Sequence, residues 1–313
     1  MAASTLASPI ASASPEIIPI AGEAARGSST WRRFCQHRLA AASTAILAAM
    51  LLAVAFGPLL WQVPINDIDF SAQLDGPSWS HPFGTDDLGQ DLFARMLYGG
   101  RISLAVGLTA ALVAILIGTF IGAIAGMSIG AVDAALMWLT DLFLSLPPLP
   151  LLLLLMYLFR DPLKQLVGPE FGVFILIVAV IGGFRWMPAA RLVRAQFLSL
   201  REKEFVEAAR ALGMGSLRLV IRHILPNSLG PVIVAATIDV AAAIILESTL
   251  SFLGLGFPPD IPTWGRILFD AKDYLDIAPH WALFAGGAIF LAVLSINFIG
   301  DGLRDALDPR TSA

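Results

Sequence analysis

The chain has 313 residues, of which 57% are hydrophobic and 14% are charged, and its formal net charge is −4. Soluble domains carry roughly 25% charged residues. This composition excludes both a soluble globular protein and a disordered one, because so much apolar surface cannot be buried in one water-soluble core. The mean hydropathy of +0.77 instead predicts an all-α, polytopic membrane protein. The lack of a basic excess argues against nucleic acid as a partner, and the single cysteine, Cys35, excludes an internal disulfide.

The N-terminal part of the chain divides into a tail and a first membrane helix. Residues 1–30 are rich in Ala, Ser, Pro and Gly and predict a disordered cytoplasmic tail. Residues 39–61 form an uncharged, mostly apolar run that can cross about 30 Å of hydrocarbon and is too long for the core of a signal peptide. We therefore expect an uncleaved first transmembrane helix within a unit of residues 31–101, with a signal peptide as the alternative.

Hydropathy predicts five further transmembrane helices within residues 102–302. They cover about residues 102–130, 131–159, 171–189, 229–256 and 281–302, and residues 303–313 form a C-terminal tail. If the N-terminus is cytoplasmic, the inside segments carry 14 of the 20 Lys and Arg residues and the outside segments carry 6. Since basic residues favour the cytoplasmic side, we expect both termini to be cytoplasmic.

Glycines and prolines predict how two of these helices pack and bend. Four glycines recur at a spacing of four in the span of residues 102–130: Gly118, Gly122, Gly126 and Gly130. Such a stripe lets another helix approach closely, and we expect that helix to belong to this chain, with a partner subunit as the alternative. Pro147, Pro148 and Pro150 predict a kink in the next span, because proline cannot continue the helical hydrogen bonds.

Ionisable side chains inside membrane spans are costly and invite a functional explanation. Asp141 and Arg185 fall in cytoplasmic halves of their spans, where mutual pairing or snorkelling explains them. Asp239 and Glu247 lie deeper in the fifth span. We expect these two either to line an aqueous path or to bond to neighbouring hydroxyls and helix ends.

The segment between the fourth and fifth spans predicts a charged helix–turn–helix unit in the cytosol. Apolar residues at i, i+3, i+4 and i+7 predict a short helix over residues 204–212 with a narrow apolar face: Phe205, Ala208, Ala209 and Leu212. Glu204 and Glu207 lie off that face, and Gly213 stands where a helix end often needs a left-handed residue. A second helix, residues 216–225, should end at Pro226. This unit either docks into a groove on another protein or lies on the bilayer.

A second predicted feature precedes the second span, on the extracytoplasmic side. Asp87 and Gln90 have the spacing of a capping box, and a short interfacial helix that includes Asp91 and Arg95 should end at Gly99. We expect these four polar residues to belong to an outer gate or a docking site for a binding protein, with a structural brace as the alternative.

Sites for chemistry are not visible in the sequence. None of the three lysines, Lys164, Lys203 and Lys272, follows a glycine, so a Walker A loop is excluded. The four histidines are scattered without metal-ligand spacing, and no nucleophile–base arrangement stands out. We expect no enzyme activity, no metal site and no cofactor in this chain.

Four ordered motifs resemble those of a known family. The first is Glu207-Ala208-Ala209 with Gly213 and Leu225-Pro226, and the others cover residues 81–104, residues 247–256 followed by Trp264-Gly265, and residues 297–309. Together they are similar to the dipeptide/oligopeptide/nickel permeases of ABC importers, in the second-permease branch, and the resemblance covers about residues 31–310. The first motif resembles the EAA loop of that family, in which the helix of residues 204–212 is the coupling helix that contacts the ATPase.

The resemblance implies a type I ABC importer permease with six transmembrane helices in the bacterial inner membrane. It implies a homologous second permease, an extracytoplasmic solute-binding protein, and two cytoplasmic ATPase subunits that bind ATP and Mg²⁺. In that scheme Glu207 contacts the ATPase, Ala208, Ala209 and Leu212 pack in its groove, and Gly213 forms the turn. The implied cargo is a peptide or a related small solute. A self-contained secondary transporter is the alternative, but such proteins show inverted repeats, and no internal repeat is visible.

Overall fold

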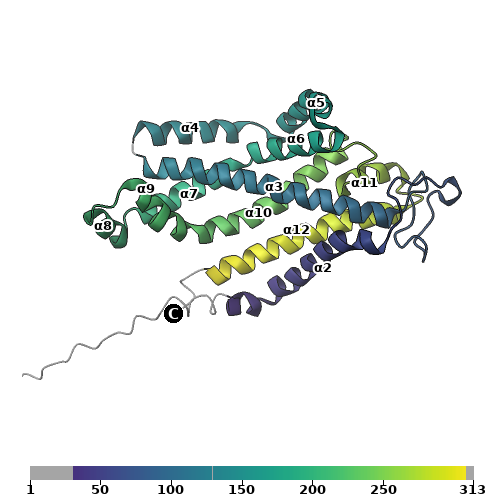
Figure 1. The fold of residues 1–313 in the computed structure, drawn as a ribbon, viewed down its shortest axis with the longest axis horizontal. Coiled ribbons are helices and arrows are strands. Elements are labelled where there is room, and N and C mark those ends of the chain that lie inside the picture. The colour runs from purple at the N-terminus through teal and green to yellow at the C-terminus, as the bar shows by residue number, and fades with distance from the viewer. Residues whose placement is uncertain (1–30, 129, 308–313) are drawn as a thin grey trace, which may run out of the picture.

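The computed structural model describes residues 31–128 and 130–307 as a bundle of helices (Figure 1). The helices with their bounds are α2 (Arg38–Leu60), α3 (Leu92–Met127), α4 (Ala131–Ser145), α5 (Pro148–Val167), α6 (Pro169–Gly183), α7 (Trp186–Leu200), α8 (Glu204–Ala211), α9 (Ser216–Leu219), α10 (Leu225–Phe252), α11 (Trp264–Ala271) and α12 (Pro279–Leu307). Short η elements cover Phe70–Ala72, Val220–Ile224 and Lys272–Tyr274. An isolated bridge joins Thr85 to Asp91, and the described residues contain no strand, so the all-α prediction is confirmed.

Four helices are long and apolar enough to cross a membrane, and two bent pairs bring the number to six when each pair counts as one span. The four are α2, α3, α12 and the continuous helix from Ser216 to Phe252. The predicted first and last spans therefore agree with α2 and α12, although α12 extends into the predicted C-terminal tail as far as Leu307. The predicted N-terminal tail, residues 1–30, lies outside the described residues.

Both bent pairs break inside predicted spans, near the middle of the third span and in the last third of the fourth. α4 and α5 meet at 84°, and α5 begins at Pro148, so the kink expected from the prolines is confirmed. α6 and α7 meet at 42° across Phe184 and Arg185, whose backbone angles (φ −118°, ψ 16° and φ −125°, ψ 4°) are not helical. The predicted fourth span shows no such break, although Pro188 lacks the N–H that the carbonyl of Phe184, four residues earlier, would accept in a continuous helix.

The glycine stripe of α3 is where α7 packs. A Cβ atom at Gly118 would lie 2.6 Å from Cβ of Ala189, and one at Gly126 would lie 2.5 Å from Cβ of Phe197. Only glycine permits the backbones of two helices to approach this closely. Close packing within the chain is thus confirmed for three of the four glycines, because Gly122 meets α7 in the same way. Gly130 differs: it has a positive φ of 79° in the turn before α4 and no neighbour within 4 Å.

A proline inside α2 explains one contact between the first helix and α3. Pro58 lacks an N–H, which leaves the carbonyl of Val54, four residues earlier, without its helical partner. The Arg101 guanidinium donates to this carbonyl at 2.5 Å and to that of Ala55 at 2.7 Å. A side chain of α3 therefore replaces the missing backbone donor and fixes α2 against the bundle.

Helix α3 begins later than the sequence pattern suggests. Asp91 is its N-cap, because Oδ1 accepts a hydrogen bond from the backbone N–H of Ala94 at 2.6 Å. The expected capping box of Asp87 and Gln90 is therefore wrong, and these two residues lie in the loop that precedes the helix.

The expected end of a short helix at Gly99 is also wrong, because α3 continues through Gly99 and Gly100 as one helix. These glycines serve close packing instead. A Cβ atom at Gly99 would lie 3.1 Å from Cα of Thr263, and one at Gly100 would lie 2.8 Å from Cζ2 of Trp264. The start of α11 thus rests directly on the backbone of α3.

The two ends of the bundle carry different parts (Figure 1). α8 and α9 lie at one end, together with the beginning of α2 and the end of α12. The loop between α2 and α3 and helix α11 lie at the opposite end. We refer to these as the α8 end and the loop end.

Candidate functional site

Helix α8 is anchored by one face and exposes another. Val206 and Ala209 are buried in a cluster with Val193 and Phe197 of α7 and Leu219 of α9. The predicted apolar face is therefore divided, because Ala209 points into the protein while three of its members are exposed: Phe205, Ala208 and Leu212. Phe205 is 42% and Leu212 87% exposed. Large apolar side chains held outward on an anchored helix are typical of a protein interaction surface.

The polar residues of α8 also face outward. Glu204 and Glu207 are exposed in its first turn and form no ion pair with any residue in the described part of the chain. At the other end, Gly213 adopts a left-handed φ of 78°, which confirms its predicted turn. The backbone N–H of Met214 then returns to the carbonyl of Ala209 at 3.1 Å and caps the helix end.

The helix after this turn does not end at Pro226. The backbone N–H of Leu225 bonds to the carbonyl of Val220, five residues earlier, in a short π-helix, Val220–Ile224. The chain passes through it into α10, with Pro226 in the first turn, so that one helix runs from Ser216 to Phe252. The prediction of a helix stop at Pro226 is wrong, because a changed hydrogen-bond register lets the helix accommodate the proline.

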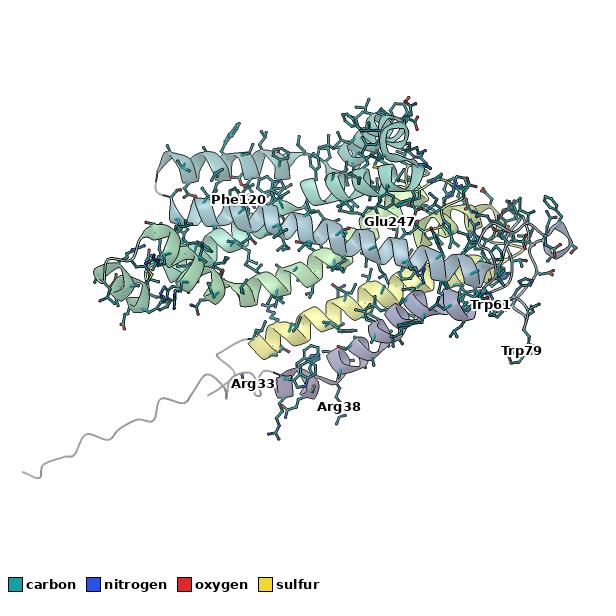
Figure 2. All side chains as sticks on the ribbon, viewed as in Figure 1. Arg33, Arg38, Trp61, Trp79, Phe120 and Glu247 are labelled. Carbon is teal, nitrogen blue, oxygen red and sulfur yellow. The ribbon has the colours of Figure 1, made fainter. Side chains whose placement is uncertain are left out.

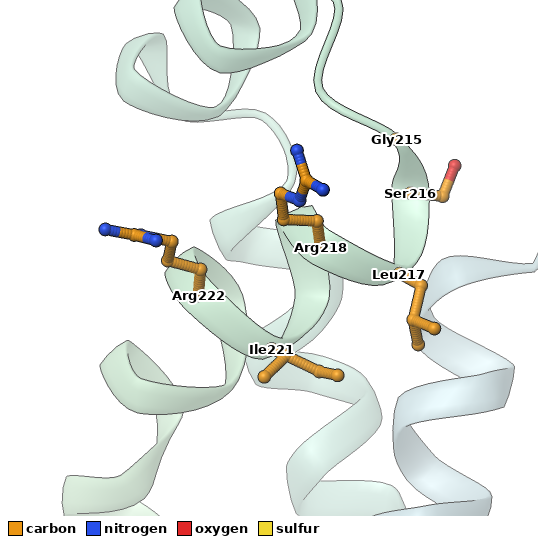
Figure 3. A pocket seen from close by; sticks show the side chains of 6 residues that line it. All are labelled: Gly215, Ser216, Leu217, Arg218, Ile221 and Arg222. Atoms are coloured by element: carbon orange, nitrogen blue, oxygen red, sulfur yellow. The ribbon is translucent and has the colours of Figure 1, made fainter.

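A depression of about 940 Å³ lies over α9 and this π-helix (Figure 3). Leu217 and Ile221 present apolar side chains and Arg218 and Arg222 present basic ones, each pair four residues apart. The sequence analysis missed these residues, although the repeated spacing of four places each pair on one face. They extend the exposed surface of α8 with apolar and positively charged groups.

At the loop end, Asp91 joins three segments. Besides capping α3, its Oδ1 accepts from Nε1 of Trp61 at 3.1 Å, and its Oδ2 lies 2.8 Å from Nδ1 of His81. The side chain of Asp91 is almost fully buried. These contacts hold the end of α2 and the loop against the start of α3, which is the arrangement of a brace.

Arg95 and Gln90 form a second buried group. The Arg95 guanidinium donates to Oε1 of Gln90, to the carbonyl of Ile65 at 3.2 Å and to that of Pro259 at 3.2 Å. Asp86 lies 3.6 Å from Arg95; burial raises the pKa of its carboxyl, and the Arg95 charge opposes the rise. Three of the four predicted gate residues, Gln90, Asp91 and Arg95, are thus buried in contacts within the chain.

Asp87, the fourth predicted gate residue, is partly exposed. Its Oδ2 accepts from the Tyr274 hydroxyl at 3.3 Å. Trp79 is fully exposed on the same loop and projects from the loop end (Figure 2). The role of this surface as a gate or dock stays a prediction.

Glu247 is fully buried and lies inside the bundle (Figure 2). Its carboxylate accepts from the hydroxyls of Ser103 at 3.1 Å and Ser251 at 2.8 Å. Ser103 in turn accepts from the backbone N–H of Trp264, the first residue of α11. Glu247 therefore joins α3, α10 and α11. Of the two arrangements expected for it, the structure shows bonding to neighbouring hydroxyls, and a role in lining the path stays a prediction.

Asp239 forms an ion pair with Arg185. Nη2 of Arg185 lies 2.5 Å from Oδ1 of Asp239. Asp239 stands midway along α10, deeper than the sequence-based boundaries suggest, because α10 begins at Leu225 and ends at Phe252. Its role in the path stays a prediction.

Of the two explanations expected for Asp141 and Arg185, snorkelling or mutual pairing, the pairing is wrong. Asp141 pairs with Arg191 of α7, and both side chains are more than half exposed. Asp133, at the start of α4, binds Arg194 at 2.5 Å and 2.6 Å through both oxygens. α4 is thus held to α7 by surface pairs, which leaves Arg185 to Asp239. Among the described residues, no group of acidic, histidine or cysteine side chains could hold a metal ion.

The sequence matches two family models. Residues 118–313 match the binding-protein-dependent transport system inner membrane component, and residues 26–77 match the N-terminal TM domain of oligopeptide transport permease C. The chain is 42% identical over 290 residues to the oligopeptide transport system permease protein OppC of Escherichia coli K12, covering 91% of this chain and 92% of that protein. It is 38% identical over 287 residues to the dipeptide transport system permease protein DppC of Alkalihalophilus pseudofirmus, covering 90% of each.

A solved structure has the same fold. The MetNI methionine ABC transporter, in an inward-facing conformation, matches with a TM-score of 0.51 and 19% identity, over 68% of this chain and 96% of the matched chain. The fold is the all-α permease fold of type I ABC importers, as the resemblance implied. The chain belongs to the family of binding-protein-dependent transport system inner membrane components.

Proposed function

We propose that this permease forms half of the translocation path of an ATP-driven importer for peptides or related small solutes, beside a homologous second permease in the bacterial inner membrane. Relatives named for oligopeptide and dipeptide transport support this cargo class. Family membership favours an importer subunit over a self-contained secondary transporter and accords with a chain that is not an enzyme. ATP and Mg²⁺ are bound by partner ATPase subunits, and a binding protein delivers cargo at the loop end.

The observation that carries the proposal is the exposed face of α8. Phe205 and Leu212 point away from the bundle while Val206 fixes the helix to α7 and α9. An ATPase groove that covers these two side chains removes their apolar surface from water, and the free carboxylate of Glu207 supplies a polar contact beside them. The α8 end is therefore cytoplasmic, and both termini lie on that side.

Helix α8 is also placed to move the membrane part of the chain. Only Gly213 and two further loop residues separate Leu212 from the start of the continuous helix Ser216–Phe252. A displacement of α8 by the ATPases is passed to α10, on which Asp239 and Glu247 lie. This linkage provides the two-state element that nucleotide can bias.

Site-directed cross-linking tests the proposal. With the exposed Cys35 replaced by serine, Ala208→Cys should form a cross-link to a co-expressed ATPase subunit through a short maleimide that carries a photoreactive group. Trp79→Cys, equally accessible at the loop end, should form none, and a membrane-impermeant maleimide should label it on intact cells from outside. Cross-linking of the ATPase to position 79, or outside labelling of position 208, would overturn the assignment of the two ends.

A further inference from the structure

A cavity of about 190 Å³ lies where both bent spans break. Leu146 and Pro148 line it at the break between α4 and α5, and Phe184 and Arg185 line it at the break between α6 and α7. Leu246 of α10 contributes a further wall. Interrupted helices at membrane depth are tolerated where they are buried in protein or line a polar cavity, and in transporters such interruptions form substrate sites.

Arg185 brings a positive charge to this cavity, and Asp239 holds it in place. Nη2 and Nε of Arg185 donate to Oδ1 of Asp239 at 2.5 Å and 3.2 Å. In the described part of the chain, the third nitrogen, Nη1, donates to no acceptor. The Arg185 side chain is 26% exposed and that of Asp239 is 7% exposed. The accessible member of the pair is thus the cation, and the carboxylate lies behind it.

The surroundings of Arg185 favour an anion. Arg185 is the N-cap of α7, a helix of 15 residues, and a helix N-terminus carries a partial positive charge. The other named residues that line the cavity are apolar, so their side chains supply no oxygen that could replace the hydration shell of a cation. A guanidinium with a free nitrogen matches a carboxylate, which accepts from it with charge-assisted hydrogen bonds.

We propose that Arg185, oriented by Asp239, binds the carboxylate of a transported peptide at mid-membrane. The site rests on the proposed function, because it takes the cargo to be a peptide. Asp239 is a positioning residue: it keeps the guanidinium at the helix break and balances its charge when no cargo is present. A buried ion pair adds little stability compared with apolar residues of the same size, so its presence at this cavity accords with a role in binding.

Uptake of matched peptides tests this inference in cells that carry the complete transporter. Two labelled peptides without acidic side chains differ only at the C-terminus, as free acid or amide. A third peptide carries the amide and one glutamate, and it distinguishes a C-terminal carboxylate from a side-chain carboxylate. Because the same binding protein serves every strain, its own preference cancels when the acid-to-amide uptake ratio is compared between strains.

The double variant Arg185→Gln/Asp239→Asn removes the site without leaving an unpaired charge. We expect its acid-to-amide uptake ratio to fall about tenfold, which corresponds to about 1.4 kcal/mol, while Arg185→Lys retains part of the preference. The matched control is Arg191→Gln/Asp141→Asn, which removes an exposed Arg–Asp pair between α7 and α4 and should leave the ratio unchanged.

Two results would overturn the inference. An equal loss of uptake for acid and amide in the double variant would show that the pair is only structural, and an unchanged ratio with full uptake would show that Arg185 does not contact cargo. If the wild-type transporter imports none of the three peptides although its subunits assemble, the peptide cargo itself is wrong, and both proposals fail for that separate reason.

Discussion

Gly213 allows a sharp test of the α8 turn, because its backbone is left-handed and its surroundings are empty. A Cβ atom at this position would meet nothing within 4 Å, so a serine adds no overlap with another residue. The cost is confined to the backbone, where the left-handed conformation of an L-residue costs about 1–2 kcal/mol. The native turn of Gly213→Ser should therefore be roughly five- to thirtyfold less populated relative to competing turns.

Peptide uptake and membrane abundance measure this effect together. We expect Gly213→Ser to reduce uptake several-fold at normal abundance, because the change affects an eight-residue helix at the end of the bundle and leaves the spans intact. Gly213→Asn should be milder, since asparagine tolerates the left-handed region. Gly215→Ser is the control: its φ is −65°, it caps α9, and a Cβ there also meets nothing. Normal uptake by Gly213→Ser, or an equal loss in Gly215→Ser, would refute the requirement for this turn.

Two further predictions concern stability, measured as thermal unfolding of the purified protein in detergent. Gly122→Ala should lower the free energy of unfolding by about 1–3 kcal/mol, because its Cβ would lie 2.5 Å from the carbonyl oxygen of Ala190. Gly286→Ala, with no neighbour within 4 Å, should be neutral or slightly stabilising. Equal effects of the two variants would contradict the tight α3–α7 contact. Asp91→Ala should cost about 2–3 kcal/mol, from a lost helix cap and two lost side-chain contacts. Asp87→Ala, which loses one contact at 3.3 Å, should cost well under half of that, and the reverse order would contradict the brace.

The long spans were predictable because the bilayer fixes their length and the sequence shows few charges within them. The predicted span of residues 39–61 agrees with α2, and the prolines at 147, 148 and 150 predicted the break before α5. The break at Phe184 and Arg185 was not predicted, although Pro188 removes the helical hydrogen bond to the carbonyl of Phe184. One proline near a helix start does not determine whether or how far a span bends, because the bend also depends on neighbouring helices, which a single sequence does not reveal.

Helix α8 shows what the spacing of apolar residues can predict and what it cannot. Its extent was predicted to within one residue, because Gly213 and the apolar spacing mark its end. Which face is buried was predicted only in part. Val206 lies beside Phe205 on the helix surface, and two adjacent apolar stripes satisfy the same spacing rule. Contact with α7 decides that Val206 and Ala209 turn inward, and a tertiary contact of this kind leaves no local signal.

The Arg185–Asp239 ion pair also depends on tertiary structure, and α10 links it to the α8 end. Asp239 and Arg185 are 54 residues apart in the sequence, so the identity of the partner depended on the bend between α6 and α7. From Ser216 to Asp239 the chain is one helix, about 35 Å long at 1.5 Å per residue. Under the proposed function, a movement of α8 therefore reaches the Arg185–Asp239 pair through a single rigid element. Closure of the ATPases, which displaces α8, would thus also alter the proposed carboxylate site and couple release of the cargo to nucleotide.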